Sequence, residues 1–501
     1  MGIHSNSDDS AARGDEPTGR PDPVGQPGAD VTPVNPALVA LLRTPRFWAG
    51  PLLVVAIVMT TLAFMYVGAV AKPTANLHNF PIAVVNDDAG GIAAPGSPQQ
   101  NFGQQIVDGL VKATDPHQFR LKRLSIADAY EQLDTGKVYG AIIIGNGFTA
   151  NALSIGRTIV LDQSAAVPAR PVITVITNPR AGPMGGQIVA KYADVALAAA
   201  QQQFGQQFTG TINGQLQSMG KPALTPLQAL GLVHPIDIQT QQTMSPDGNG
   251  NGLTAFYFSL LLVLAGFTGA MIVQTLVDGS LGVLPSEIGP FYLMRKDLGI
   301  SRWGTLVIKW FFMFLVALIM SSLYVLACYL VGMDLPNMFA LWMFSVFAIT
   351  AVGVSAASVM AVFGNAGMII NLIVFVVLGV PSAGATVPLE ASPRLFTWLS
   401  WFEPLHQIYL GVRSILYFGG DFAAGLGMSL IMTGVGLLIG IALGLLTTKY
   451  YDRKGWAREP GQLVLLGPSR GRAGRAQASV TEPASADTVA PHHSRGVTTT
   501  E

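Results

Sequence analysis

Long apolar runs divide the chain into segments that can cross a membrane and polar segments that cannot. A helix rises about 1.5 Å per residue, so about 20 apolar residues cross a hydrocarbon core of about 30 Å. One such run precedes a long polar stretch, and the others follow it. We therefore predict six transmembrane helices, at residues 47–71, 253–276, 304–332, 338–363, 367–384 and 424–447.

The distribution of basic residues sets the predicted orientation. Three clusters flank the spans: Arg43 with Arg46, then Arg295 with Lys296 and Arg302, then Lys449 with Arg453 and Lys454. The positive-inside rule places all three in the cytoplasm, which requires an even number of spans. This argument retains the fifth run, although Pro381 and Gly384 interrupt it. Both termini are then cytoplasmic, and residues 72–252 lie outside.

The first apolar run ends in Ala69-Val70-Ala71, which has the form of a signal-peptidase site. However, the run is longer than the core of a signal peptide, and a long polar segment precedes it. We therefore expect an uncleaved anchor.

The outside segment has the pattern of an α/β domain. Apolar or alternating stretches predict strands at 81–86, 119–125, 139–145 and 156–163. Helical periodicity predicts short helices at 102–113 and 126–138, and an apolar stripe predicts one long helix over 187–219. That stripe packs either on its own domain or on a second copy of the chain.

Composition narrows the class of protein. Hydrophobic residues make up 50% of the chain and charged residues 12%, with a net charge of zero. Soluble proteins carry about 25% charged residues. The fold class is therefore an α-helical integral membrane protein of the plasma membrane, and a nucleic-acid-binding protein or a cytosolic enzyme is excluded. The polar ends, 1–40 and 457–501, are predicted to be disordered in the cytoplasm. The lone Cys328 can form no disulfide within the chain.

Catalytic signatures are absent from the sequence. There is no phosphate-binding G-x-x-x-x-G-K-[ST], no H-E-x-x-H and no G-x-S-x-G. The seven histidines are scattered along the chain. We therefore expect no enzyme activity, no cofactor and no metal site, so any ATP hydrolysis belongs to a partner.

Few polar residues interrupt the predicted spans. Lys309 is close enough to the cytoplasmic end of the third span to extend to the interface, and no acidic residue lies deep in a span. Asn371 is either a helix-to-helix hydrogen bond or a substrate contact. Small residues spaced by four, which let helices approach within one subunit or between two, are Gly436, Gly440, Gly444, Gly353 and Ala357.

Two connecting segments carry further candidates. The outside segment 385–423 is amphipathic and aromatic, which is typical of a helix in the outer leaflet. Its Trp398, Trp401 and Arg413 join Asn371 on a possible substrate path. In the cytoplasm, Arg295, Lys296 and Arg302 are either a docking site for an ATPase or a plain connector.

Three segments carry a resemblance to a known family. They are PIAVVNDDAGG (81–91), DTGKVYGAIIIGNGFTANAL (134–153) and WFEPLHQIYLGVRSILYFGG (401–420). With the arrangement of the spans, they resemble the permease subunits of type-two ABC exporters, in particular the phage-infection-protein group and the nitrosoguanidine-resistance-like membrane proteins. The chain departs from the family at Gly145-Asn146, where an Ile-Pro pair is common.

The resemblance implies one half of an exporter. Two copies would form a homodimer, and a separate cytoplasmic ABC ATPase would dock at about residues 285–303. The substrate would be hydrophobic, amphipathic or lipid-like.

Two other functions stay open. One is a membrane-anchored surface receptor or scaffold whose outside domain binds a wall polymer, a phage or a protein. The other is a proton-coupled carrier, which the lack of acids in the spans disfavours, although Asp334 and Asp421 lie at outer span ends.

Overall fold

A computed structural model describes most of the chain between residues 43 and 456. The described residues are 43–45, 49, scattered positions from 52 to 69, 72–93, 98–161, 169–226, 232, 234–243, 252–293, 295 and 299–456. The predicted disordered ends, 1–40 and 457–501, lie outside them, as does most of the predicted first span. The described residues up to Gly455 belong to one compact unit.

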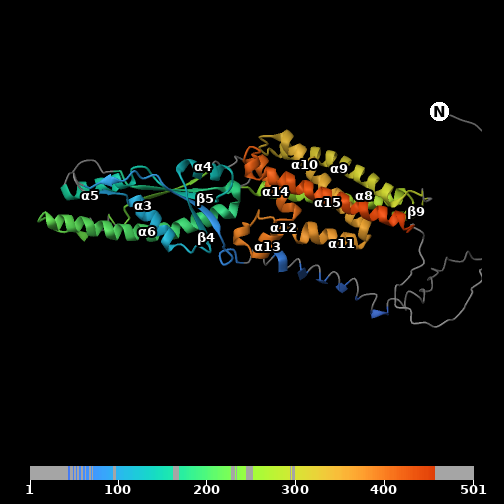
Figure 1. The fold of residues 1–501 in the computed structure, drawn as a ribbon, viewed down its shortest axis with the longest axis horizontal. Helices are drawn as coiled ribbons and strands as arrows, with labels where there is room; N and C mark the ends of the chain where they lie inside the picture. Colours follow the sequence, from blue (N-terminus) through green and yellow to red (C-terminus); the bar gives the residue numbers. More distant parts are fainter. Residues whose placement is uncertain are drawn as a thin grey trace, which may run out of the picture. The chain divides into compact units, whose positions relative to one another are not determined.

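A five-stranded mixed sheet forms the centre of the α/β domain, residues 72–243 (Figure 1). Its order is β4-β1-β5-β6-β7, with β5 and β6 antiparallel and the other neighbours parallel. The strands are β1 (Phe80–Asn86), β4 (Phe119–Arg123), β5 (Gly140–Ile144), β6 (Val172–Thr177) and β7 (Asp237–Gln242). Two short strands, β2 (Gly91–Ile92) and β3 (Gln99–Gln100), form a separate hairpin.

Helices cover both faces of this sheet. The side chains of β1 alternate between the two faces and are therefore buried on both sides. Phe80, Ile82 and Val84 pack with α3 (Phe102–Ala113), α5 (Phe148–Leu161) and α6 (Pro183–Ser218). Ala83 and Val85 pack on the other side, with α4 (Ile126–Asp134). The second half of the predicted stripe of α6, with Phe204, Phe208, Ile212 and Leu216, is buried within its own domain, whereas Val195 and Ala199 of the first half are exposed.

The domain differs from the sequence pattern in two places. Residues 156–161, predicted as a strand, continue helix α5, because Gly156 lies against Phe208 of α6 and Val160 is buried in the same cluster. Packing on α6 overrides the β-propensity of Thr158-Ile159-Val160. The edge strand β7 reads DIQTQQ and is largely exposed, so no alternation indicated it.

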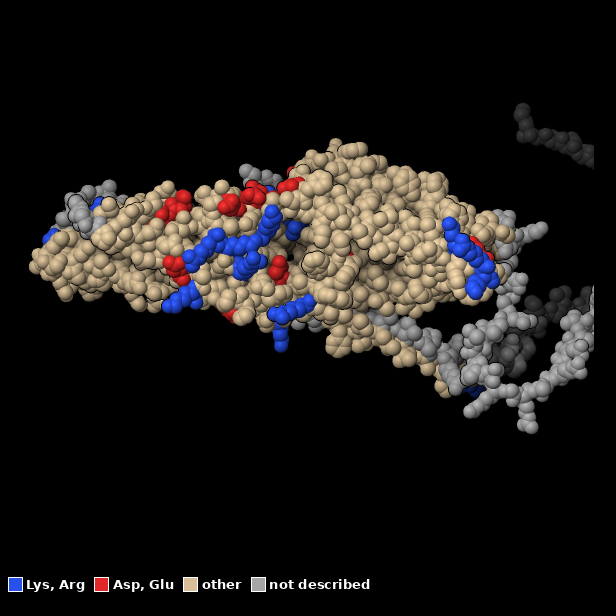
Figure 2. Space-filling view, in the orientation of Figure 1, with Lys and Arg blue, Asp and Glu red and all other residues tan. Residues whose placement is uncertain are grey.

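Four helices among the described residues are long and apolar enough to cross a membrane. They are α8 (Leu253–Ser280), α9 (Arg302–Val331), α10 (Met338–Phe363) and α15 (Leu426–Arg453). Helix α10 is central and packs against the other three. On the face shown in Figure 2, charged side chains lie over the α/β domain and at one end of the helices, and the surface between is uncharged. The chain is therefore a membrane-embedded protein.

The predicted fifth span is shorter and irregular. It consists of α11 (Ala366–Leu372), a π-helical turn η3 (Ile373–Val377) and α12 (Gly379–Ser382), following a turn at Gly364. Tyr66, in the predicted first span, donates a hydrogen bond to the Val376 carbonyl (3.1 Å). The described positions of the first span, such as Leu52 and Phe64, are helical.

The segment 385–423 does not lie wholly on the surface. Its longer helix, α14 (Pro404–Tyr417), packs against α8 and α15 and buries most of its residues. The exposed part comes before it: Trp398 of α13 (Arg394–Leu399) and Trp401, in the turn after α13, are each 61% exposed. An apolar helical face has the same sequence pattern against lipid and against other helices, so the pattern could not distinguish the two environments.

Candidate functional site

A cavity of about 260 Å³ lies in the helical bundle between α10, α11 with η3, α14 and α15. Its lining is mainly apolar, with Phe375, Ile408 and Leu437 among the contributors. The rim reaches the surface of the bundle, because Phe402 and Ile439 are 60% and 62% exposed. π-Helical turns such as η3, which also lines the cavity, occur frequently at functional sites.

Three lining residues each carry a side-chain oxygen without a hydrogen-bond partner in the described part of the chain: Asn371, Gln407 and Thr433. Hydrogen bonds from the side-chain nitrogens fix the orientation of the Asn371 and Gln407 amide groups. Nδ2 of Asn371 donates to the Ala356 carbonyl (3.0 Å), and Nε2 of Gln407 donates to the Ser400 carbonyl (2.9 Å). A carbonyl only accepts, so the amide oxygens are the unused atoms. Asn371 thus makes a helix-to-helix hydrogen bond and also lines the cavity.

The predicted small residues of α15 have different surroundings. A Cβ on Gly440 would lie 2.8 Å from Cα of Ser355, so this glycine permits the close approach of α10 and α15. Gly444 faces Ser358 of α10 and Leu306 of α9. Gly436 lines the cavity, and a Cβ there would meet no atom of the described residues within 4 Å.

The small residues of α10 are also packed within the chain. Gly353 faces Met313 of α9 and the carbonyl of Gly266 in α8, and Ala357 is 1% exposed. Gly353, Ala357, Gly440 and Gly444 therefore support packing within one subunit.

Glu403 and His406 begin helix α14 next to the cavity, outside the four spanning helices. The Glu403 carboxylate Oε2 accepts the His406 backbone N–H (2.9 Å) and caps the helix. Burial raises the pKa of Glu403 to about 8. Burial also lowers the pKa of His406 to about 4. Its Nδ1 lies 2.8 Å from the Ala383 carbonyl, so the neutral ring carries its hydrogen on Nδ1.

A buried ion pair joins α8 and α9. Lys309 Nζ lies 2.7 Å from Asp278 Oδ1, and both side chains are at most 4% exposed. Gln274 accepts from Lys309 (2.7 Å) and donates to Asp278 (2.8 Å), which closes a three-residue network. The expectation that Lys309 extends to the interface was wrong, because Asp278 neutralises it inside the protein. Asp278 was missed because the apolar run ends at 276, two residues before it.

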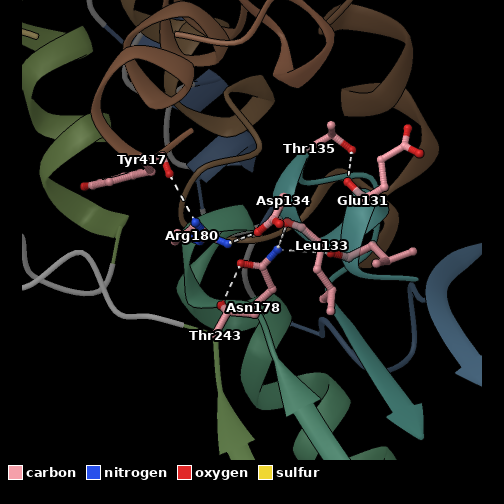
Figure 3. A network of polar contacts seen from close by, with 9 residues as sticks. Glu131, Leu133, Asp134, Thr135, Asn178, Arg180, Thr243 and Tyr417 are labelled. Atoms are coloured by element: carbon pink, nitrogen blue, oxygen red, sulfur yellow. Dashed lines mark hydrogen bonds and ion pairs between the residues drawn. The ribbon is translucent and has the colours of Figure 1, made fainter. Parts of the chain in front are cut away.

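Helix α14 also contacts the α/β domain (Figure 3). Arg180 forms an ion pair with Asp134 (2.8 Å) and donates to the Tyr417 carbonyl of α14 (3.5 Å). Beside it, Asn178 donates to the Leu133 carbonyl (2.7 Å). These contacts hold the loop after β6 against the end of α4 and the end of α14.

Arg413 belongs to this same contact. Its guanidinium donates to the Ala181 carbonyl (3.2 Å) and lies 5.6 Å from the ring centres of Tyr409 and Phe418. It does not line the cavity, and neither Trp398 nor Trp401 lines it. Of the four residues predicted on a substrate path, only Asn371 lines this cavity.

The predicted docking residues lie near the short hairpin β8 (Ser286–Ile288) and β9 (Phe291–Leu293). Arg295 is exposed, and Lys296 is outside the described residues. Arg302 begins α9, where its backbone N–H and that of Trp303 donate to the Asp452 carboxylate of α15 (3.1 Å each).

A second concave surface, of about 780 Å³, lies between α3 and α6 on the α/β domain. Ala196, Ala199 and Val195 line it together with polar residues such as Lys191 and Gln203. The Val195 side chain is 68% exposed. Sequence periodicity identified α6 but not this groove, which depends on where α3 packs.

The model of one protein family matches residues 51–432, more than half of the 501-residue chain. The family is described as a protein of unknown function, DUF3533. The matched range includes the α/β domain and the helices from α8 to α14. No curated protein matches the chain.

Proposed function

We propose that this chain, which belongs to the DUF3533 family, is the membrane-spanning permease subunit of an ABC-type exporter. It moves a hydrophobic, amphipathic or lipid-like substrate outward. A separate cytoplasmic ATPase supplies the energy, since the sequence has no phosphate-binding loop of its own.

The observation that carries this proposal is the cavity between α10, η3, α14 and α15. An apolar cavity with a few polar groups is the usual form of a small-molecule site. Its rim is exposed on the apolar surface of the bundle, so a substrate dissolved in the bilayer reaches it sideways. At about 260 Å³ it holds one part of an amphipathic molecule rather than the whole.

The proposal includes six crossings of the plasma membrane with both termini in the cytoplasm. The fifth crossing is Ala366–Ser382, which spans about 25 Å and lies near the lower limit for a bilayer. The contact of Tyr66 with Val376 supports a first crossing beside it. Two copies give a pathway of twelve helices.

Movement of the substrate is coupled to the outside domain through α14. The first half of this helix, with Pro404, Gln407 and Ile408, lines the cavity. Its last turn is held by Arg180 and by the contact of Arg413 with Ala181. When the ATPase draws α8 and the α11–α12 segment together, α14 transmits the change to the domain at the exit.

The test is purification of the tagged full-length chain in mild detergent, with identification of co-purifying proteins and an ATPase assay. We expect a stoichiometric ATP-binding partner that is lost on Arg295→Glu, because Arg295 is exposed in the proposed docking loop. Arg120→Glu, which reverses an exposed charge of the α/β domain, is the matched control and retains the partner. A homo-oligomer with no ATPase would contradict the proposal.

A surface receptor or scaffold is the second candidate, favoured by the α3–α6 groove. In that function the outside domain binds a wall polymer, a phage or a protein, and the helices serve as its anchor. Filling the groove by Gly109→Trp, at a glycine with no atom within 4 Å of a Cβ, then abolishes function. An exporter whose site is the bundle cavity retains export in that variant.

A further inference from the structure

The polar side chains of the cavity leave three oxygens that can each accept a hydrogen bond. The Asn371 and Gln407 amides are each held by one hydrogen bond from the nitrogen to a backbone carbonyl. Their oxygens and the Thr433 hydroxyl oxygen have no partner among the described residues. These three side chains are 1%, 4% and 8% exposed, so bulk water does not satisfy them. Leaving buried acceptors unpaired costs free energy that a donor on a bound molecule recovers.

The charge of the cavity lining further restricts the class of ligand that can bind. None of the described residues that line the cavity is acidic or basic. An anion would therefore enter an apolar site that supplies no positive charge, which is unfavourable. Amide oxygens are the negative ends of dipoles and stabilise a cation, as carbonyl oxygens do in cation channels. A primary ammonium group carries three N–H donors, as a lysine side chain does.

Access to the cavity is from the side of the bundle. Phe402 and Ile439, at the rim, are each more than half exposed. A molecule with an apolar tail in the bilayer can therefore place its head between α14 and α15 without passing through water. The remaining lining, from residues such as Phe375 and Leu437, suits the first methylene groups of the tail.

Resting on the proposed export function, we infer that the substrate is a cationic amphiphile whose primary ammonium head binds in this cavity. Asn371, Gln407 and Thr433 supply the acceptors. The class comprises long-chain amines and lipids with a free amine, and it excludes fatty acids and other anionic amphiphiles.

Equilibrium binding to the full-length protein in phosphatidylcholine nanodiscs tests this inference. The probes are radiolabelled dodecylamine, dodecyltrimethylammonium, which is cationic but has no N–H, and dodecanoate. We expect dodecylamine to bind, dodecyltrimethylammonium to bind about fivefold or more weakly than the amine, and dodecanoate not to bind above empty nanodiscs. Dodecanoate binding as tightly as the amine, or equal binding of both cations, would overturn the inference.

Variants locate the binding. Thr433→Val keeps the shape of the side chain and removes an oxygen that has no partner, so the protein folds and dodecylamine binding weakens about fivefold. Gln407→Leu weakens it at least as much. Thr268→Ala, on the exposed face of α8, is the control and leaves binding unchanged. Binding that is unaffected by both cavity variants contradicts the assignment.

The outcomes separate the two proposals. Amine binding lost in the cavity variants, without any ATPase partner, retains the substrate class and removes the ABC exporter. An ATPase partner together with no amine binding retains the exporter and removes the substrate class.

Discussion

Asp88 in the α/β domain and the cavity residues of the helical bundle differ in how far their buried polar atoms are paired. In the domain, the buried Asp88 carboxylate accepts from the backbone N–H groups of Gly90, Gly103 and Thr149 and from the Thr149 hydroxyl. Every one of these bonds fixes the start of a helix or a turn. In the bundle, the oxygens of Asn371 and Gln407 are buried and unused.

The difference separates polar groups that are fully used within the fold from polar groups that can still accept a hydrogen bond. Asp88 belongs to the segment Asn86-Asp87-Asp88-Ala89-Gly90 that the family resemblance rests on, and its contacts show that this segment joins β1 to α3 and α5. A fully satisfied carboxylate has no capacity left for a ligand. The spare acceptors of the bundle have that capacity.

The largest expected effect concerns the Lys309–Asp278 ion pair of the bundle. It is buried and paired like Asp88, so we expect it to stabilise the fold. Lys309→Met leaves Asp278 charged and buried, and we expect it to lower the free energy of unfolding by about 3–5 kcal/mol. Combining it with Asp278→Leu restores much of the loss, because no isolated charge remains. Thermal unfolding of the three variants in the same detergent measures the effect. If Lys309→Met alone were neutral, the pair would not be a structural element.

Asp88→Ala tests the structural role of the paired carboxylate in the α/β domain. It strands the N–H groups of Gly103 and Thr149 without an acceptor, and we expect a loss of about 3 kcal/mol in the α/β domain. Hydrogen exchange of the β1 and α3 amides reports this local stability. Asp87→Ala is the matched control, since Asp87 is only half-buried. Equal exchange in both variants would remove the structural role assigned to Asp88.

Local patterns predict each half of the molecule but not the contacts between elements. The four long helices follow from uninterrupted apolar runs, and Asn371 stands out as a polar residue within one of them. Gln407 and Thr433 do not stand out, because they line a cavity only after α14 and α15 pack beside α10. Asp278 and Lys309 are 31 residues apart, and nothing in either segment indicates the other.

Two glycines on α15 test whether the cavity is open space beside a tightly packed helix contact. Gly436→Ala places a methyl group in the open cavity and should leave the thermal stability nearly unchanged. Gly440→Ala forces the methyl group against Ser355 and should cost about 1–3 kcal/mol. Gly436→Leu, whose larger side chain fills the cavity, should block dodecylamine binding while the protein stays folded. Equal stability losses at both glycines would mean that α15 packs tightly along this whole face.

The smallest expected effect is a pH dependence at the start of α14. The pKa of Glu403 is raised by burial to about 8 from an ordinary 4.5, and that of His406 is lowered by burial to about 4 from 6.5. Between pH 4.5 and 6.5 the two oppose each other, because the folded state keeps the Glu403 proton while the unfolded state gains one on His406.

Above pH 6.5 the unfolded His406 has lost its proton and only Glu403 differs between the two states. The folded state then binds more protons than the unfolded state, so stability falls as the pH rises from 6.5 to 8. Glu403→Gln, which cannot ionise and can still accept the His406 N–H, should flatten this part of the profile. Melting temperatures of wild type and Glu403→Gln at pH 6.5, 7.2 and 8.0 are compared, with His406→Gln as the control that changes only the acidic side. A parallel decline in wild type and Glu403→Gln would assign the pH dependence to another group, and the Glu403 carboxyl would then act only as the cap of α14.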